Sequence, residues 1–196
     1  MDIVLLSGWS GSGKDFVANI FELYGFTKLS FAGELKKIIA HKYNIPLELT
    51  QTQEGKRQII PSVKKSVRNI LIQEGQEIRK EKGYGYFAEC VAQTIIDTSL
   101  KRVVISDWRF PVELETLKNQ LPKERFHTIR ILRVDQQSSP ILDMYTENQL
   151  DFFAFNYYFE NPGVYSMNNS LYNQIKKFFV KIDIPCDVET DDGIGK

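Results

Sequence analysis

The sequence has little that would tie the protein to a membrane, a structural metal or an oxidising compartment. Cysteine and histidine each occur only twice in 196 residues, and neither pair has metal-site spacing. Cys90 and Cys186 lie far apart, which indicates a reduced, cytoplasmic protein. No apolar run approaches about 20 residues, and the first one is too short and lacks the basic leader of a signal peptide. The 25 basic and 25 acidic residues cancel, so neither nucleic acid nor an anionic membrane is an expected partner.

The apolar residues are numerous enough for a full core, and their pattern alternates between strands and helices. At 42% hydrophobic residues the chain is expected to form one domain over residues 1–196. This alternation predicts an α/β fold, a three-layer sandwich whose five-stranded sheet is mostly parallel. The expected strands are residues 2–7, 27–31, 102–106, 128–134 and 157–160. We expect residues 47–61 to be a connection without regular structure, and a long helix containing Val63 to follow Pro61.

A glycine-rich loop between the first strand and the first helix is the strongest motif. Gly8 to Lys14 fits the phosphate-binding pattern G-x-x-x-x-G-K, with Gly8, Gly11, Ser12 and Gly13 in the loop. Glycines let the backbone wrap around a phosphate chain, and the next helix directs its positive end at the anion. Lys14 would reach the β- and γ-phosphates. The motif therefore predicts ATP binding.

Asp15 departs from the pattern, because serine or threonine is usual at this place. The usual hydroxyl touches Mg²⁺, and a carboxylate could hold the same ion directly or through water. Alternatively, Asp15 only complements the positive end of the helix. Both interpretations stay open from the sequence.

Polar side chains at the carboxyl ends of the strands are the other candidates, since ligands of parallel sheets bind at that edge. Asp107 follows a buried strand and is a candidate Mg²⁺ ligand or base; the alternative is a helix or turn cap. Arg109 is either a catalytic cation or a surface charge. Arg133 ends the fourth strand, just before a polar stretch, about 135–149, that we interpret as a lid. The aromatic run 152–159 could stack a base, but core packing is the more ordinary role.

Two arginines mark one face of the long helix. Arg68 and Arg79 are eleven residues apart, which places them on the same side and about 16 Å apart. A phosphate-bearing acceptor could use this face together with Gln73, although most such charge on helices is only solvated.

Several blocks resemble the phage and viral deoxynucleoside monophosphate kinases, which have the P-loop nucleoside monophosphate kinase fold. Together the blocks span most of the chain, and their order is more specific than any one of them. They are residues 10–15, 31–36, 67–75 with Arg79 just beyond, 104–113 and 161–163.

The resemblance implies transfer of the γ-phosphoryl group of ATP to a nucleoside monophosphate, with Mg²⁺ as cofactor. Acceptor binding would lie within about 33–100, and relatives of this kind are often dimeric, which leaves a homodimer open. By this resemblance Lys14 holds ATP, and Asp107 and Arg109 act at the transfer site. Arg133, from its place before the lid, is a further catalytic candidate, and Asp15 and Asp107 are the candidate metal ligands. Asn161 and Gly163 would lie near the adenine, and Lys36, Arg68, Gln73 and Arg79 would bind the acceptor.

Some features depart from the family. Glu34 stands where many relatives have proline, the lid stretch contains no arginine, and residues 47–61 match nothing. Two other functions therefore remain as alternatives. One is a phosphomevalonate kinase-like enzyme, because that family shares the Gly13-Lys14-Asp15 loop and a similar Asp107 block. The other is an ATP-binding module without transfer activity.

Overall fold

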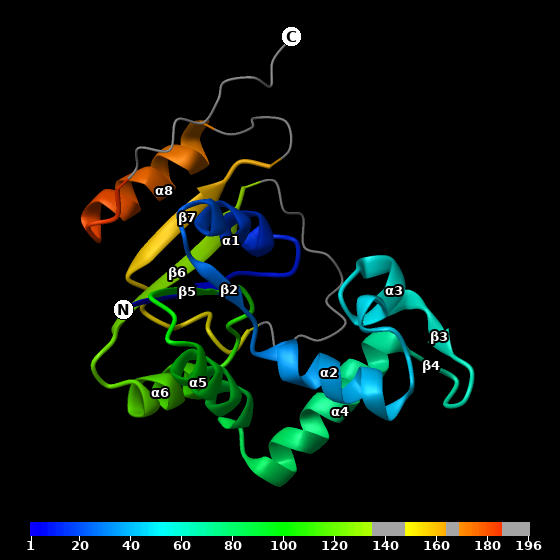
Figure 1. Cartoon of the computed structure of the whole chain (residues 1–196). Helices are drawn as coiled ribbons and strands as arrows, with labels where there is room; N and C mark the ends of the chain where they lie inside the picture. Colours follow the sequence, from blue (N-terminus) through cyan, green and yellow to red (C-terminus); the bar gives the residue numbers. More distant parts are fainter. Residues whose placement is uncertain (135–147, 164–168, 186–196) are drawn as a thin grey trace.

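The computed structural model describes residues 1–134, 148–163 and 169–185, and a five-stranded sheet forms its centre (Figure 1). The strands are β1 (Asp2–Ser7), β2 (Thr27–Leu29), β5 (Arg102–Ile105), β6 (Arg125–Arg133) and β7 (Tyr157–Asn161), in the order β2-β5-β1-β6-β7. Every neighbouring pair is parallel, so the predicted sheet is confirmed. The central position of β1 places the loop that follows it between the ends of β5 and β6.

Helices cover both faces of the sheet, which explains why its central strands β1 and β5 are almost continuously apolar. Ile3 and Leu5 of β1 face a core shared with α5 (Tyr86–Thr98) and α6 (Pro111–Gln120). Val4 and Leu6 face the opposite core, shared with α1 (Lys14–Leu23) and α8 (Asn169–Lys181). The predicted three-layer arrangement is therefore confirmed.

The remaining elements, residues 32–82, project beside the sheet and are called the helical arm below (Figure 1). They are α2 (Ala32–Lys42), η1 (Leu47–Thr50), α3 (Gln53–Arg57), β3 (Ile59–Ile60), β4 (Lys65–Ser66) and α4 (Val67–Lys82). Glu74 of α4 fastens the arm internally, because its buried carboxylate accepts hydrogen bonds from Lys42 Nζ at 2.7 Å and Tyr43 OH at 2.5 Å. These bonds and the Lys42 charge outweigh the effect of burial and lower the pKa of Glu74.

The expectation of an unstructured connection at 47–61 was wrong. Thr52 caps α3 by accepting a hydrogen bond from the Gly55 backbone N–H at 3.0 Å. Gly55 packs so closely that an added Cβ would lie 2.6 Å from Leu49 Cα. Elements this short show no periodicity, which is why the polar sequence concealed them.

Two element boundaries also differ from the prediction. The long helix begins at Val67, where Ser66 caps it, and Val63 instead lies between the short strands β3 and β4, which pair antiparallel. Strand β6 begins at Arg125 rather than at 128, because Arg125 and His127 each contact Asp2 at 2.9 Å at the start of β1. Polar side chains at the strand's beginning hid it from the sequence pattern.

The segment 148–156 packs against the core on the α5 and α6 side of the sheet and brings aromatic rings to Trp108. Phe153 and Phe155 lie edge-on to the Trp108 ring, with centroids 4.9 and 5.5 Å away. The core role is thus confirmed for these two rings and wrong for Phe152, which is fully exposed. Most of the expected lid, 135–147, lies outside the described residues. Among the described helices, none is both long and apolar enough to cross a membrane.

Candidate active site

The glycine-rich loop has the backbone shape that the motif requires. Gly8, Gly11 and Gly13 have φ values of 151°, 80° and 99°, a region that favours glycine. Gly13 precedes α1 directly, and no side chain caps the helix there. The first amides of α1 are therefore available to an anion, and the helix dipole adds to their attraction.

Side chains from the two strands beyond β1 hold this loop. Arg133 Nη1 at the end of β6 donates to the Gly11 carbonyl at 3.0 Å. Asn161 Nδ2 at the end of β7 donates to the Ser12 carbonyl at 2.9 Å, and its Oδ1 accepts from the Gly163 N–H at 3.1 Å. These predicted residues meet at the loop although they lie far apart in the sequence.

The amino group of Lys14 lies folded back over the loop. Lys14 Nζ donates to the carbonyls of Gly8 at 2.6 Å and Trp9 at 2.8 Å. Backbone carbonyls are exchangeable partners for an ammonium group, so a phosphate entering the loop offers the same nitrogen a stronger, charged acceptor. This placement suits the role expected of Lys14.

Asp15 lies at the start of α1, next to the end of β5. Its side chain is 81% exposed, and its Oδ1 is 3.0 Å from Lys28 Nζ and 3.3 Å from Ser106 Oγ, which donates to it. Although exposed, Asp15 is partly desolvated by its neighbours, which alone would raise its pKa; the hydrogen bonds from Lys28 and Ser106 and the Lys28 and Lys14 charges outweigh this effect and lower that pKa. An ionised, accessible carboxylate beside a hydroxyl fits the oxygen ligands that Mg²⁺ prefers.

Asp107 performs the capping role that was the alternative in the sequence. Its Oδ1 accepts from the Phe31 N–H at 2.8 Å, and its Oδ2 accepts from Ser30 Oγ at 2.8 Å and the Ala32 N–H at 2.9 Å. Both oxygens thus hold the start of α2, the first helix of the arm. Asp107 is engaged by the protein itself and acts here as a positioning residue.

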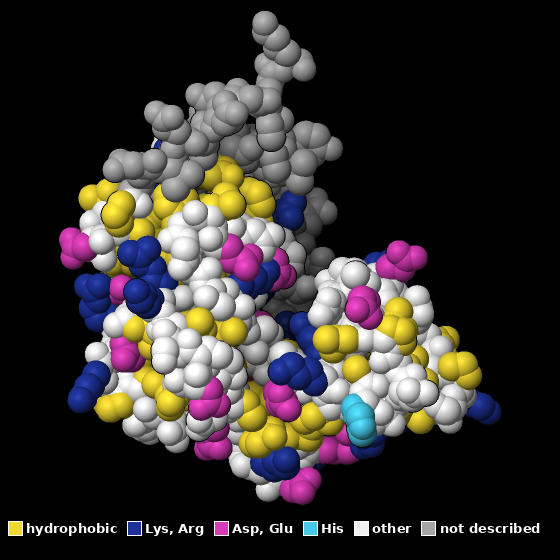
Figure 2. All heavy atoms as spheres, in the orientation of Figure 1, with side chains coloured by type: hydrophobic (Ala, Val, Ile, Leu, Met, Phe, Trp, Pro, Cys, Tyr) yellow, Lys and Arg dark blue, Asp and Glu magenta, His cyan; other side chains and the backbone are white. Residues whose placement is uncertain are grey.

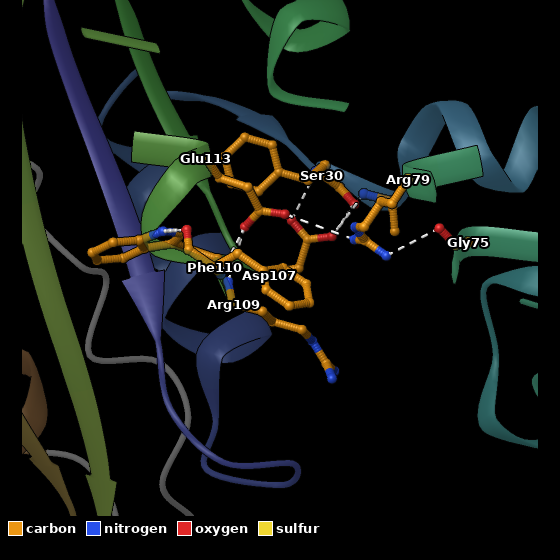
Figure 3. Close-up of polar contacts among 10 residues, drawn as sticks. Ser30, Gly75, Arg79, Asp107, Arg109, Phe110 and Glu113 are labelled. Atoms are coloured by element: carbon orange, nitrogen blue, oxygen red, sulfur yellow. Dashed lines mark hydrogen bonds and ion pairs between the residues drawn. The ribbon is translucent and has the colours of Figure 1, made fainter. Parts of the chain in front are cut away.

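Partly buried Arg79 and fully buried Glu113 form a pair near Asp107 (Figure 3). The Arg79 guanidinium lies over the rings of Phe87 and Phe110, 5.0 and 4.7 Å from their centroids, and its Nη2 is 3.8 Å from Glu113 Oε1. Burial lowers the pKa of Arg79, and the Arg109 charge adds to this effect against the attraction of Glu113 and Asp107. Arg79 of α4 therefore contacts Phe87, Phe110 and Glu113, which lie on the sheet side of the site.

Glu113 is the most perturbed titratable group of the site. Its Oε2 accepts the backbone N–H groups of Arg109 and Phe110, both at 3.1 Å. Burial raises its pKa to about 7, and the nearby Asp107 charge adds to the increase, against the two hydrogen bonds and the Arg79 charge. Glu113 lies in the block 104–113, and its burial could not be inferred from the sequence pattern.

The other expected acceptor residues have different surroundings. Arg68 Nη2, at the start of α4, donates to Gln53 Oε1 of α3 at 2.6 Å. Gln73 is exposed; its Oε1 accepts from Lys65 at 2.5 Å and its Nε2 donates to Glu77 at 2.9 Å. The side chain of half-exposed Lys36 on α2 forms no ion pair or hydrogen bond with the described residues.

Lys56 on α3 is the residue that sequence reasoning missed. Burial lowers its pKa, and so do the charges of Lys36, Arg68 and Arg109, while Asp15 opposes them. We call Lys36, Lys56, Arg68 and Arg109 the basic cluster. Figure 2 shows dark blue side chains in a hollow where the arm meets the sheet side of the molecule. A threonine cap followed by Lys56-Arg57 was the available signal in the sequence.

Comparison with known proteins gives the fold and not the family. No family model matches the chain, and no curated protein sequence matches it. A dephospho-CoA kinase from Campylobacter jejuni is similar in structure, with 17% identity, a TM-score of 0.50, and 93% and 98% of the two chains covered. This chain has the fold of the P-loop kinases.

Two other kinase structures align at lower scores. A sugar kinase from Janibacter sp. has 12% identity and a TM-score of 0.48, with 94% of this chain and 95% of that chain covered. A shikimate kinase from Bacteroides thetaiotaomicron has 13% identity and a TM-score of 0.40, with 92% and 98% covered.

Proposed function

We propose that this protein is an ATP-dependent kinase whose acceptor is a phosphate monoester, a nucleoside monophosphate in the first place. The observation that supports it most is the phosphate loop, whose Lys14 Nζ lies over the loop carbonyls at 2.6 and 2.8 Å. The arm contributes Lys36 and Arg68, and Gln53 holds Arg68 at 2.6 Å. A site for an uncharged acceptor would gain little from these cations. A dianionic phosphate would be attracted by each of them.

The engagement of Asp107 supports the same acceptor class. A hydroxyl acceptor needs a base to remove its proton, whereas a phosphate monoester has its second pKa near 6 and is mostly dianionic at neutral pH. Its oxygen can attack without losing a proton. Since three hydrogen bonds already occupy the carboxylate of Asp107, phosphate as nucleophile fits this site better than alcohol.

In the proposed reaction, the loop and Lys14 hold ATP, and Arg68 and Lys36 hold the acceptor phosphate. A non-bridging acceptor oxygen forms a bond to the γ-phosphorus. The bond from that phosphorus to the β,γ-bridging oxygen breaks, and its electron pair leaves with ADP. Catalysis is then alignment plus charge stabilisation. Asp15 and Ser106 are the residues that would hold Mg²⁺, which when bound neutralises charge on the β- and γ-phosphates.

The experiment is an ADP-release assay with Mg-ATP and a panel of acceptors. The panel contains the ribo- and deoxynucleoside monophosphates, phosphomevalonate, and a mixture without acceptor. We expect rapid turnover with one or a few nucleotides. Activity on phosphomevalonate alone would assign the chain to that substrate, whereas ATP binding without any acceptor-dependent release would contradict the kinase proposal.

Arg68→Met tests the acceptor side of the same assay. The variant should raise the acceptor KM by about 10- to 100-fold, the loss expected for one charge-assisted phosphate contact, with little effect on ATP affinity. An unchanged acceptor KM would remove Arg68 from the site.

A further inference from the structure

Arg130 of β6 is a buried arginine beside the last residue of β1. Its Nη1 donates to Ser7 Oγ at 3.1 Å, and its Nη2 lies 2.7 Å from Asp151 Oδ1. The guanidinium carbon is 5.6 Å from the centroid of the Phe155 ring. Only 7% of Arg130 is exposed, and a buried guanidinium is unfavourable unless it is paired and hydrogen-bonded. These contacts therefore fix a charged group directly before the phosphate loop.

Asp151 extends this network to the loop itself. Its Oδ1, which receives Arg130, also accepts a hydrogen bond from Trp9 Nε1 at 3.4 Å, across 142 residues of sequence. Ser7 and Trp9 stand on the two sides of Gly8, the first glycine of the loop. Glycine has no side chain and the widest backbone freedom, so contacts of its two neighbours must restrict it. Arg130 and Asp151 together supply such contacts.

The two halves of the loop are thus held in different ways. Arg133 and Asn161 hold the second half by bonds to the backbone carbonyls of Gly11 and Ser12. Arg130 and Asp151 hold the first half by the side chains of Ser7 and Trp9. The first half also carries the carbonyls of Gly8 and Trp9, to which Lys14 Nζ donates. Its shape therefore sets the direction from which Lys14 approaches a phosphate.

A phosphate loop binds well only while its N–H groups and its lysine converge on one anion. We propose that Arg130 and Asp151 are positioning residues for the nucleotide, which keep the first half of the loop in its ATP-binding shape by fixing Ser7 and Trp9. Without the pair, the loop would adopt this shape for a smaller fraction of the time, and the apparent Kd would rise in inverse proportion. The inference rests on ATP binding by the proposed kinase, but it does not depend on the acceptor.

Asp151→Ala tests the inference, with Asp2→Ala as the matched control. Asp2 also accepts bonds from β6, from Arg125 and His127 at 2.9 Å, but at the opposite end of β1. Calorimetric titration with ATP and Mg²⁺ should show a Kd about five- to twentyfold higher for Asp151→Ala, and Asp151→Glu should restore part of the affinity. Asp2→Ala should lower the melting temperature but keep the ATP Kd within about twofold of the wild type, because its contacts lie far from the loop.

Tryptophan fluorescence reports the loop directly in the protein without nucleotide. The chain contains two tryptophans, and Trp108 is 1% exposed, so acrylamide reaches mainly the half-exposed Trp9. Asp151→Ala should raise the quenching constant by about 1.5-fold or more, because Trp9 loses its partner, and Asp2→Ala should leave it unchanged.

These measurements separate this inference from the proposed function. If the wild type bound ATP and the three proteins had equal ATP affinities, the inference alone would be overturned. An equal loss of affinity in both alanine variants, or an unchanged quenching constant in Asp151→Ala, would also overturn it. If the wild type bound ATP but transferred phosphate to no acceptor, the kinase proposal would fail, and the titrations would still decide the role of Asp151. Melting temperatures show that the variants are folded.

Discussion

Asp107 Oδ1 accepts a hydrogen bond from the backbone N–H of Phe31 at 2.8 Å, across 76 residues of sequence. The bond joins the end of β5 to the start of α2. With the bonds from Ser30 and Ala32, it orients the helix that carries Lys36 relative to the phosphate loop. Asp107 thus affects both the stability of the arm and its alignment.

Asp107→Asn tests whether Asp107 stabilises and aligns the arm by capping. The amide nitrogen cannot accept a hydrogen bond, so at least one donor at the start of α2 loses its partner, at a cost of about 1–2 kcal/mol in the free energy of unfolding. We also expect a several-fold higher acceptor KM. Urea denaturation and steady-state kinetics measure these changes. Ser30→Ala, which removes one donor, should cost less, and an unchanged stability of Asp107→Asn would contradict the capping role.

Gly13→Ala should weaken ATP binding at least tenfold. An added Cβ would overlap Asn161 Nδ2, and the φ of 99° is unfavourable for alanine. The matched control is Gly33→Ala in α2, where a Cβ meets nothing within 4 Å and alanine favours the helix. Calorimetric ATP titration compares the two variants, and equal affinities would show that loop geometry does not control binding.

Lys14→Met should lower kcat by at least a hundredfold and leave the fold intact. Lys14 Nζ donates to the carbonyls of Gly8 and Trp9 in its own loop, so its loss removes charge from the phosphates rather than a core contact. Circular dichroism and the melting temperature check folding beside the ADP-release assay. Normal turnover would exclude Lys14 from the phosphate site.

The titration of Glu113 should make the free energy of unfolding fall as pH rises. Its pKa is raised to about 7 in the folded state, against an ordinary value of 4.5. Between these values the folded state retains a proton that the unfolded state has lost, so the free energy of unfolding declines from about pH 4.5 to about pH 7 and then levels off. The full difference corresponds to about 3 kcal/mol.

Glu113→Gln should remove this component, because glutamine is neutral throughout and its carbonyl can still accept the N–H groups of Arg109 and Phe110. Urea denaturation at pH 5, 6, 7 and 8 should give a flatter pH profile for the variant than for the wild type. Parallel profiles would show that Glu113 does not titrate in this range.

The sheet and the phosphate loop could be predicted from the sequence because both have local signals. Continuous apolar strands and the spacing of Gly8, Gly13 and Lys14 do not depend on distant residues. The meeting of Arg133 and Asn161 at the loop follows from parallel strands whose carboxyl ends share one edge. The role of Asp107, which contacts Phe31 at that edge, could not be decided from the sequence, because a capping residue and a catalytic residue can both be aspartate.

The helical arm was less predictable for a physical reason. Its elements η1, α3 and β3 contain two to five residues each, and tertiary contacts rather than periodicity stabilise them. Thr50 is fully buried, and Gly55 packs against backbone that only the folded arm brings near. The surroundings of Lys56 could therefore not be recognised from the sequence, because they depend on the contact between α3 and Arg68.

The central place of β1 has a consequence for synthesis on the ribosome. Strand β1 is synthesised before both of its partner strands, which comprise residues 102–105 and 125–130. Both of its edges therefore stay unpaired during much of translation. The loop after it waits longer, since Asn161 supplies the bond that holds Ser12. A nascent chain can therefore acquire a finished nucleotide pocket only after residue 161 has left the exit tunnel, and until then β1 is an apolar segment that chaperones would have to protect.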